Sequence, residues 1–184
     1  MRIVGGKYGG RVLSAPKGLA TRPTTDRTRE SLFNILSNHI SLDNKRVIDL
    51  FAGSGALGLE AMSRGAAFCL FVDMASAPRA SMRENVETLS LQGATKIFRR
   101  DATKLGQADN IKPFDLAFAD PPYSQNLGEK CASALLDGDW LNNGALFVLE
   151  ERKGEIPAKL PGYEKIDARN YGDTEIALFE KRAN

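Results

Sequence analysis

The chain has 184 residues, of which 42% are hydrophobic and 26% charged, as expected for one compact soluble domain with a substantial core. No apolar run approaches the roughly 18 residues of a membrane-spanning helix, and the N-terminus lacks the basic-then-apolar pattern of a signal peptide. We therefore expect a cytoplasmic protein without membrane contact. Neither Cys69 nor Cys131 has a partner at metal-ligand spacing, so both are expected to be reduced core residues.

The net charge of +2 conceals an asymmetry along the chain. Residues 1–30 contain seven Lys and Arg against two Asp and Glu, and the remainder carries a net negative charge. A positive field at one end can attract a polyanion, and nucleic acid is the natural candidate. A solvated basic arm without a partner is the alternative that charge alone leaves open.

The N-terminal residues predict a basic hairpin. Two short β-prone runs, 2–4 and 11–13, flank a glycine-rich turn. Basic side chains interleaved with an aromatic suit a looped RNA, because phosphates need charge and bases need a stacking surface. The alternative is that the aromatic side chain only covers the hairpin. The candidate RNA-binding residues are Arg2, Lys7, Tyr8, Arg11, Arg22 and Arg27.

A linker and a helix are expected next. Residues 14–25 contain two prolines and a glycine, which indicates an extended linker. Asp26 is the expected N-cap of a helix whose apolar residues recur at helical spacing as far as Ile40. The polar segment 22–30 could contact a phosphate or a cofactor, with surface salt bridges as the alternative. Residues 1–40 are thus predicted to form an RNA-facing extension of a domain spanning residues 41–184.

Apolar runs alternate with helical patterns from Arg46 onward. This alternation predicts an α/β fold with a mostly parallel sheet, covered by helices on both faces. The last two strands have no helix between them and predict an antiparallel C-terminal hairpin. The seven expected strands are residues 46–51, 68–73, 96–99, 114–119, 145–150, 163–169 and 174–180, with helices at 56–64 and around Pro78 to Leu89.

The first expected strand runs into a glycine loop. Gly53, Gly55 and Gly58 have the spacing of dinucleotide sites, and Asp73 stands where a ribose-binding acid is expected. The free N–H groups of the following helix can receive a nucleotide-like ligand there. These residues alone admit either a nicotinamide cofactor or S-adenosylmethionine.

Four acids near the ends of successive strands favour S-adenosylmethionine. Asp73 would accept the ribose hydroxyls, Asp101 the adenine amino group, and Asp49 the amino end of the methionine moiety. A nicotinamide dinucleotide would leave three of the acids without a role and place its pyrophosphate beside Asp49, whereas a cationic sulfonium suits that field. The candidate cofactor-binding residues are Asp49, Phe51, Gly53, Gly55, Asp73, Asp101 and Ala102.

The fourth acid belongs to the motif Asp120-Pro121-Pro122-Tyr123, the candidate catalytic residues. Prolines fix an extended turn and leave the neighbouring carbonyls free to accept hydrogen bonds. An amine held by the Asp120 carboxylate and the Pro121 carbonyl has both protons engaged, so its lone pair can face a sulfonium methyl. Tyr123 offers a stacking face for the base. The motif predicts methylation of an exocyclic amine.

These motifs carry a resemblance. Segments 49–55 and 120–123 resemble class I S-adenosylmethionine-dependent methyltransferases of the amino-methylating type. Segments 2–6, 22–34, 55–61 and 171–174 resemble the RsmD family, over nearly the whole chain. The resemblance implies a Rossmann-like fold and methyl transfer to the N2 amine of a loop guanine in 16S ribosomal RNA, with S-adenosylhomocysteine as the second product. It also implies that the RNA is presented in the small ribosomal subunit or a late assembly particle.

Other functions remain open on the residues alone. Similar motifs methylate adenine N6 or a protein glutamine amide, and nothing in the residues themselves chooses guanine. An NAD-dependent oxidoreductase and a catalytically idle RNA-binding assembly factor are rivals from other classes. We expect a monomer. We also expect no metal site, because the single histidine, His39, has no cysteine or acid at ligand spacing.

Overall fold

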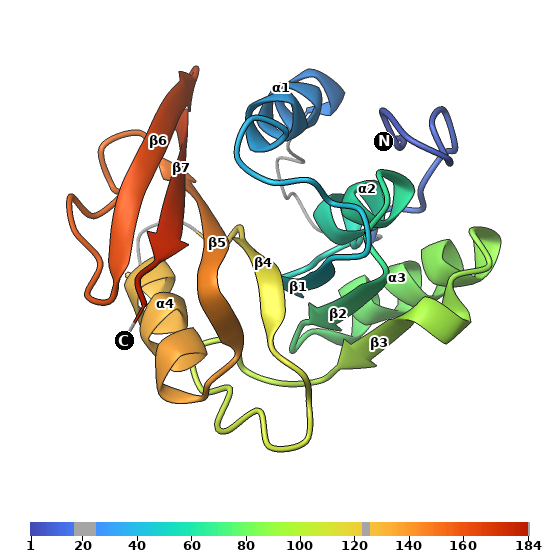
Figure 1. Ribbon diagram of the computed structural model, residues 1–184. Coiled ribbons are helices and arrows are strands. Elements are labelled where there is room, and N and C mark those ends of the chain that lie inside the picture. Colours follow the sequence, from blue (N-terminus) through green and yellow to red (C-terminus); the bar gives the residue numbers. More distant parts are fainter. Residues whose placement is uncertain (17–24, 123–125, 184) are drawn as a thin grey trace. The chain divides into compact units, whose positions relative to one another are not determined.

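The computed structural model describes residues 1–16, 25–122 and 126–183. The chain forms two compact units, Met1–Arg99 and Arg100–Asn184 (Figure 1). The first unit includes the predicted N-terminal extension together with the first three strands. The division of the chain at residue 40 therefore stays a prediction.

The first unit contains a parallel three-stranded segment of sheet. Its strands pair in the order β1, β2 and β3, and α2 packs against β1 and β2. β1 and β2 are buried at every residue but the first, as expected for parallel strands covered by helices. The elements are α1 (Asp26–Leu36), β1 (Arg46–Leu50), α2 (Ala56–Ser63), β2 (Phe68–Val72), α3 (Ser76–Thr88), the short 3-10 helix η1 (Gln92–Ala94) and β3 (Thr95–Phe98).

The second unit contains the other four strands. β4 and β5 are parallel, and β7 pairs antiparallel with both β5 and β6. The strand order is β3-β2-β1-β4-β5-β7-β6, so the predicted seven-stranded α/β sheet with an antiparallel C-terminal hairpin is confirmed. The elements are β4 (Phe114–Ala119), α4 (Leu127–Asp137), β5 (Leu141–Arg152), β6 (Tyr163–Tyr171) and β7 (Thr174–Lys181).

The predicted N-terminal hairpin is present, and it lies against α2. The Ile3 N–H donates to the Arg11 carbonyl at 2.9 Å, and the Gly10 N–H donates to the Ile3 carbonyl at 2.8 Å. Gly6 sits at a φ of +74°, and a Cβ there would overlap the Ser63 carbonyl at the end of α2. Position 6 must therefore be a glycine for the turn to lie this close to the helix.

A buried ion cluster fixes this hairpin. Glu60 of α2 is fully buried and accepts the N–H groups of Val4 and Gly5, each at 2.8 Å. The Arg29 guanidinium, 1% exposed, lies 3.5 Å from the same carboxylate, and Arg64 lies 2.8 Å from it. One carboxylate thus joins the hairpin, α1 and α2.

The ends of α1 differ from the prediction. The N-cap is Thr25, whose hydroxyl accepts the Thr28 N–H at 3.1 Å, so the prediction of Asp26 as N-cap is wrong. Asp26 instead pairs with Arg29 at 2.9 Å. The helix ends at Leu36, before the predicted Ile40.

Burial of both cysteines is confirmed, and neither forms a disulfide. None of the helices in the described ranges has the length and apolar character needed to cross a bilayer.

Candidate active site

The loop between β1 and α2 is built from residues in the left-handed region. Phe51, Gly53 and Gly55 have φ angles of +53°, +57° and +81°. The turn at Phe51 ends β1 at Leu50, one residue before the predicted end. Among the residues that the structure describes, an added Cβ at Gly53 would have only the Phe51 carbonyl oxygen nearby, at 3.9 Å. The space beside this glycine is therefore open to a ligand.

Asp49 supplies the helix cap that the loop itself lacks. Gly55 is the N-cap residue of α2 and has no side chain to accept a hydrogen bond. The Asp49 carboxylate, 2% exposed, accepts the Gly58 N–H at 2.9 Å instead. Burial raises the pKa of Asp49 to about 8; the Gly58 N–H opposes this effect and the Asp73 carboxylate adds to it.

Gly58 allows α2 to approach β2 closely. A Cβ at this position would overlap Phe71 and stand 2.6 Å from the Cys69 sulfur. The third glycine of the motif therefore serves helix–strand packing.

Asp73 holds the loop from the end of β2. Its two carboxylate oxygens accept the Gly53 N–H at 3.0 Å and the Ala75 N–H at 2.9 Å. The carboxylate remains partly exposed, as an acceptor for ribose hydroxyls requires. Arg79 secures the following turn by donating to the carbonyls of Asp73 and Ala75, a contact that the sequence did not reveal.

Asn85 is a second residue that the sequence pattern missed. Its side chain is 2% exposed and donates to the Ser54 carbonyl of the glycine loop at 2.9 Å. The same amide accepts the Ser14 N–H at 2.7 Å and donates to the Ser14 carbonyl at 3.0 Å. It thereby joins the loop to the segment that leaves the hairpin. Its 71-residue separation from Ser14 left no local signal.

The predicted RNA-binding residues are largely exposed. Lys7, Arg11 and Arg27 are exposed, and the Lys7 ammonium lies 5.3 Å from the centre of the half-buried Tyr8 ring. Arg2 is also exposed and pairs with Asp26 at 3.3 Å. Arg22 lies outside the described residues. The role of these side chains in RNA binding stays a prediction.

The second unit carries the predicted catalytic motif. Asp120 follows β4 directly and is half-buried, Pro121 is buried, and Pro122 is exposed. Tyr123 lies outside the described residues. The carboxylate is therefore presented at the carboxyl end of the strand, where ligands of open α/β sheets bind.

Asp101 is kept ionised by a local turn. Its Oδ1 accepts the Thr103 hydroxyl at 2.7 Å and the Thr103 N–H at 2.9 Å, and these bonds hold its pKa below the usual value. The neighbouring Ala102 is buried. An ionised acceptor here suits an exocyclic amino group such as that of adenine.

The residues present fit S-adenosylmethionine. In the first unit, the glycine loop, the N-terminus of α2 and the partly exposed Asp73 can receive a nucleotide-like ligand. Within the described residues, no group of three or more His, Cys, Asp or Glu could hold a metal ion.

Comparison with known proteins identifies the family. Residues 1–180 match the model of a family described as conserved hypothetical protein 95. The Ribosomal RNA small subunit methyltransferase D of Escherichia coli K12 is 35% identical over 184 residues, which cover 100% of this chain and 91% of that protein. This chain belongs to the RsmD family of methyltransferases.

Other relatives agree with this membership. A putative rRNA methyltransferase of Bacillus subtilis, YlbH, is 35% identical to this RsmD-family chain over 99% of its length and 100% of the relative. The solved structure of the putative methyltransferase YhhF from Escherichia coli has a TM-score of 0.86 at 34% identity, covering 100% of this chain and 99% of that one. The putative methyltransferase SMU.776, solved with S-adenosylhomocysteine, shares the fold at 17% identity and a TM-score of 0.64, covering 84% of this chain and 48% of that one.

Proposed function

We propose that this RsmD-family protein transfers a methyl group from S-adenosylmethionine to the N2 amine of a loop guanine in 16S ribosomal RNA. The observation that carries the proposal is the position of Asp120-Pro121-Pro122 directly after β4. The relatives named as ribosomal RNA small subunit methyltransferases support the substrate class. The second product is S-adenosylhomocysteine.

The motif would act by holding the amine. A guanine amine is delocalised into the ring and is a poor nucleophile in water. The Asp120 carboxylate and the Pro121 carbonyl would each accept a hydrogen bond from one of its two N–H groups and so direct the lone pair outward. S-adenosylmethionine would supply a methyl group activated by the positive sulfur, with the electron pair of the broken C–S bond staying on sulfur. Asp120 would take the proton that the amine loses when the new N–C bond forms.

The remaining predicted residues would hold the methyl donor. Asp73 binds the ribose hydroxyls, Asp101 the adenine amino group, and Asp49 supports the loop that receives the methionine end. Phe51, Gly53, Gly55 and Ala102 are the further candidate cofactor-binding residues of the proposal. These roles agree with the exposure of Asp73 and the lowered pKa of Asp101.

The RNA would dock on the basic hairpin. The exposed Lys7 and Arg11 supply charge for phosphates, and Tyr8 supplies a stacking surface. We propose that the protein acts as a cytoplasmic monomer on the small subunit or a late assembly particle. The target base is expected in a loop, because it must be unstacked to react and a loop allows this most easily.

The decisive test is labelled methyl transfer to small subunits from a strain that lacks this protein, followed by mapping of the modified nucleotide. We expect one N2-methylguanine in 16S ribosomal RNA. A label in adenine N6 or in a protein glutamine would overturn the choice of target, and complete absence of transfer would favour an idle assembly factor. Equilibrium binding of S-adenosylmethionine and of NAD distinguishes the methyltransferase from an oxidoreductase, because an oxidoreductase would bind NAD.

Asp120→Ala tests the catalytic assignment. We expect single-turnover transfer to fall by at least about 10³-fold, because one ligand of the amine and its proton acceptor are both lost. The affinity for S-adenosylmethionine, measured by calorimetry, should stay within about twofold of the wild-type value, because Asp120 is assigned to the amine and not to the cofactor. Glu164→Ala, an exposed acid on β6, is the control. Wild-type turnover in Asp120→Ala would contradict the mechanism.

A further inference from the structure

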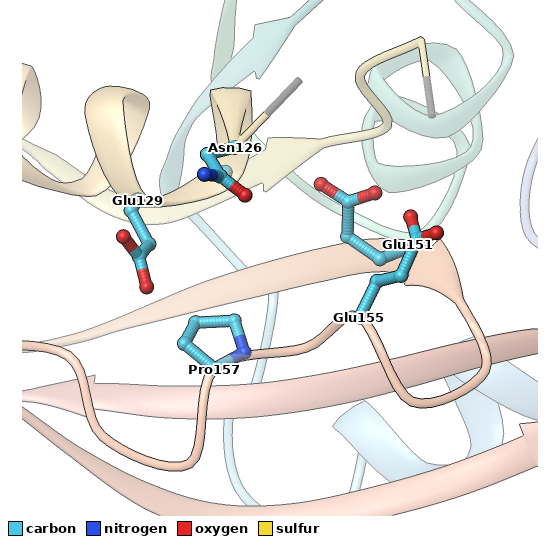
Figure 2. A pocket seen from close by; sticks show the side chains of 6 residues that line it. Asn126, Glu129, Glu151, Glu155 and Pro157 are labelled. Atoms are coloured by element: carbon cyan, nitrogen blue, oxygen red, sulfur yellow. The ribbon is translucent and has the colours of Figure 1, made fainter. Parts of the chain in front are cut away.

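A pocket in the second unit lies between the start of α4 and the end of β5 (Figure 2). Its volume is about 240 Å³. Figure 2 shows the carboxylates of Glu151 and Glu155 near one another, with Asn126 above and Glu129 on the opposite side. The pocket is lined by Asn126, Gly128, Glu129, Glu151, Glu155 and Pro157.

Glu151 is the buried member of this pocket. The residue is 5% exposed, and its Oε2 has no hydrogen-bond partner among the residues that the structure describes. Its carboxylate accepts the Gly128 N–H, and a Cβ at Gly128 would stand 3.3 Å from Oε1. One oxygen thus faces the helix N-terminus and the other is left for a donor. A buried acceptor without a donor is costly, which points to a ligand that brings one.

Burial, together with the nearby Glu155 carboxylate, raises the pKa of Glu151 to about 7, against the opposing effect of the Gly128 N–H. An N–H donor at Oε2 would stabilise the ionised form. The raised pKa of Glu151 and the unpaired Oε2 therefore both indicate that a hydrogen-bond donor would stabilise this carboxylate.

The pocket adjoins the motif that holds the amine. β4 and β5 are parallel, and Ala119 lies opposite Leu149 at the last pair of the ladder, where neighbouring strands are about 5 Å apart. Pro121 stands two residues beyond Ala119, just past the end of β4, and Glu151 stands two residues beyond Leu149 on β5. Leu149 and Glu151 point to the same side, toward α4, as the closeness of Leu149 to Gly128 confirms.

We propose that Glu151 selects guanine by accepting the N1–H of the target base on Oε2, while the neighbouring N2 amine is held by Asp120 and Pro121. This inference rests on the proposed function and deepens it. Guanine carries a hydrogen-bond donor at N1, next to the N2 amine, whereas adenine has a lone pair at N1 that an ionised carboxylate repels. Glu151 thus supplies the choice that the amine-holding motif does not make.

The chemistry of the pocket favours a base over other occupants. Flipped bases are read through hydrogen bonds to their Watson–Crick edges. The exposed Glu129 and Glu155 would repel phosphates, so the neutral edge of a base is the part of an RNA that can enter. A lysine or arginine from a ribosomal protein is the rival occupant, and the experiment distinguishes it.

The test compares guanine with 2-aminopurine, which keeps the methylatable amine but has a lone pair at N1. Small subunits are reconstituted with either base at the mapped position, and single-turnover methyl transfer is measured for the wild type and Glu151→Gln. We expect the wild type to prefer guanine by about 10²-fold, because a site built for an N–H rejects a base that lacks it. Glu151→Gln should lose at least about tenfold on guanine and little on 2-aminopurine, since the amide can donate to N1.

The controls separate the possible failures. Glu164→Gln should keep the wild-type preference, and S-adenosylmethionine binding with thermal melting should show that Glu151→Gln is folded. Glu151→Asp, which retracts the carboxylate by one methylene, gives a second variant with the same expected loss of preference.

An unchanged base preference in both Glu151 variants would overturn the inference. So would an equal rise in KM for the two substrates without a change in their ratio, which would indicate a basic side chain from a ribosomal protein in the pocket. Failure of the proposed function would be visible earlier, as wild-type protein that methylates no guanine, and it would overturn both proposals.

Discussion

The surroundings of Asp49 do little to stabilise its ionised carboxylate. The carboxylate is 2% exposed and accepts the Gly58 N–H, yet burial still raises its pKa to about 8. The Asp49 carboxyl group therefore binds a proton more readily near neutral pH than an ordinary aspartate does. A cation bound near the loop would favour release of this proton.

The raised pKa predicts a pH-dependent stability. An unfolded aspartate has a pKa of about 4, so between about pH 4 and pH 8 the native protein binds more protons than the unfolded chain. The free energy of unfolding should therefore fall as the pH rises through this range. Asp49→Asn removes the titration while keeping an acceptor for Gly58, so its stability relative to the wild type should rise between pH 4 and pH 8, by about 5 kcal/mol at most.

Urea unfolding without ligand, measured from pH 4 to pH 8, checks this expectation. Glu87→Gln, an exposed position on α3, should show no comparable divergence from the wild type. A stability difference for Asp49→Asn that is constant with pH would contradict the assignment.

At the scale of single elements, α2 depends on one glycine. Gly58 faces Phe71 and Cys69 on β2, and a Cβ would overlap the aromatic ring. Gly58→Ala should destabilise the protein by about 1–3 kcal/mol, because an extra methyl group must displace a packed core. It should also weaken S-adenosylmethionine binding, since the helix start would move relative to the loop.

Gly93→Ala is the matched control for this change. An added Cβ there has no neighbouring atom within 4 Å in the described part of the chain. Thermal melting of the two variants should show a loss for Gly58→Ala alone; equal melting temperatures would rule out the packing role.

The ion cluster of Glu60 gives a second prediction for α2. Glu60→Gln removes the buried one of the two carboxylates that pair with the Arg29 guanidinium, which is 1% exposed, and leaves only Asp26. Breaking a buried pair in this way should cost about 3–5 kcal/mol. Chemical denaturation measures the loss, and limited proteolysis should show faster cleavage within residues 1–13. Glu84→Gln, exposed on α3, should match the wild type; equal stability of Glu60→Gln would contradict the role of the cluster.

Elements with a local pattern could be predicted from the sequence, and their ends could not. The seven strands and the glycine loop follow from apolar runs and residue spacing. β5 runs from Leu141 to Arg152 and is longer than predicted. The prediction missed its first part because that part lacks the apolar run that marks a buried strand. α1 ends before Ile40, since helical spacing alone does not show where a helix stops.

The candidate site was predictable where one residue type at a strand end sufficed. Asp49 and Asp120 stand where the pattern put them. The contacts of Asn85, Arg79 and Glu151 were not predictable, because tertiary packing decides which buried polar groups meet. Asn85 and Ser14 are 71 residues apart, and no local pattern links them.

For the whole molecule, the relevant property is the uneven distribution of charge. Seven of the 25 basic residues lie in the first 30 positions, and Lys7 and Arg11 are exposed on the hairpin. The double variant Lys7→Glu and Arg11→Glu should weaken binding to ribosomal RNA and flatten its salt dependence. Each lost phosphate contact should reduce the slope of log affinity against log salt by about 0.7–0.9.

Filter binding over a range of salt concentrations measures this slope. Arg83→Glu with Lys96→Glu, which are exposed elsewhere in the first unit, is the control of equal charge change. If both double variants shift the affinity equally, net charge and not the hairpin attracts the RNA.

The bonds between the hairpin and Glu60 also constrain the order of events during synthesis. The Val4 and Gly5 N–H groups find their acceptor 56 and 55 residues later in the chain. The hairpin cannot acquire these bonds until α2 has left the ribosome, although it precedes α2 in the chain. Closure of so long a loop adds an entropic cost that strands joined by short helices do not carry. The surface expected to receive ribosomal RNA is thus made early and fixed late, after the glycine loop has been translated.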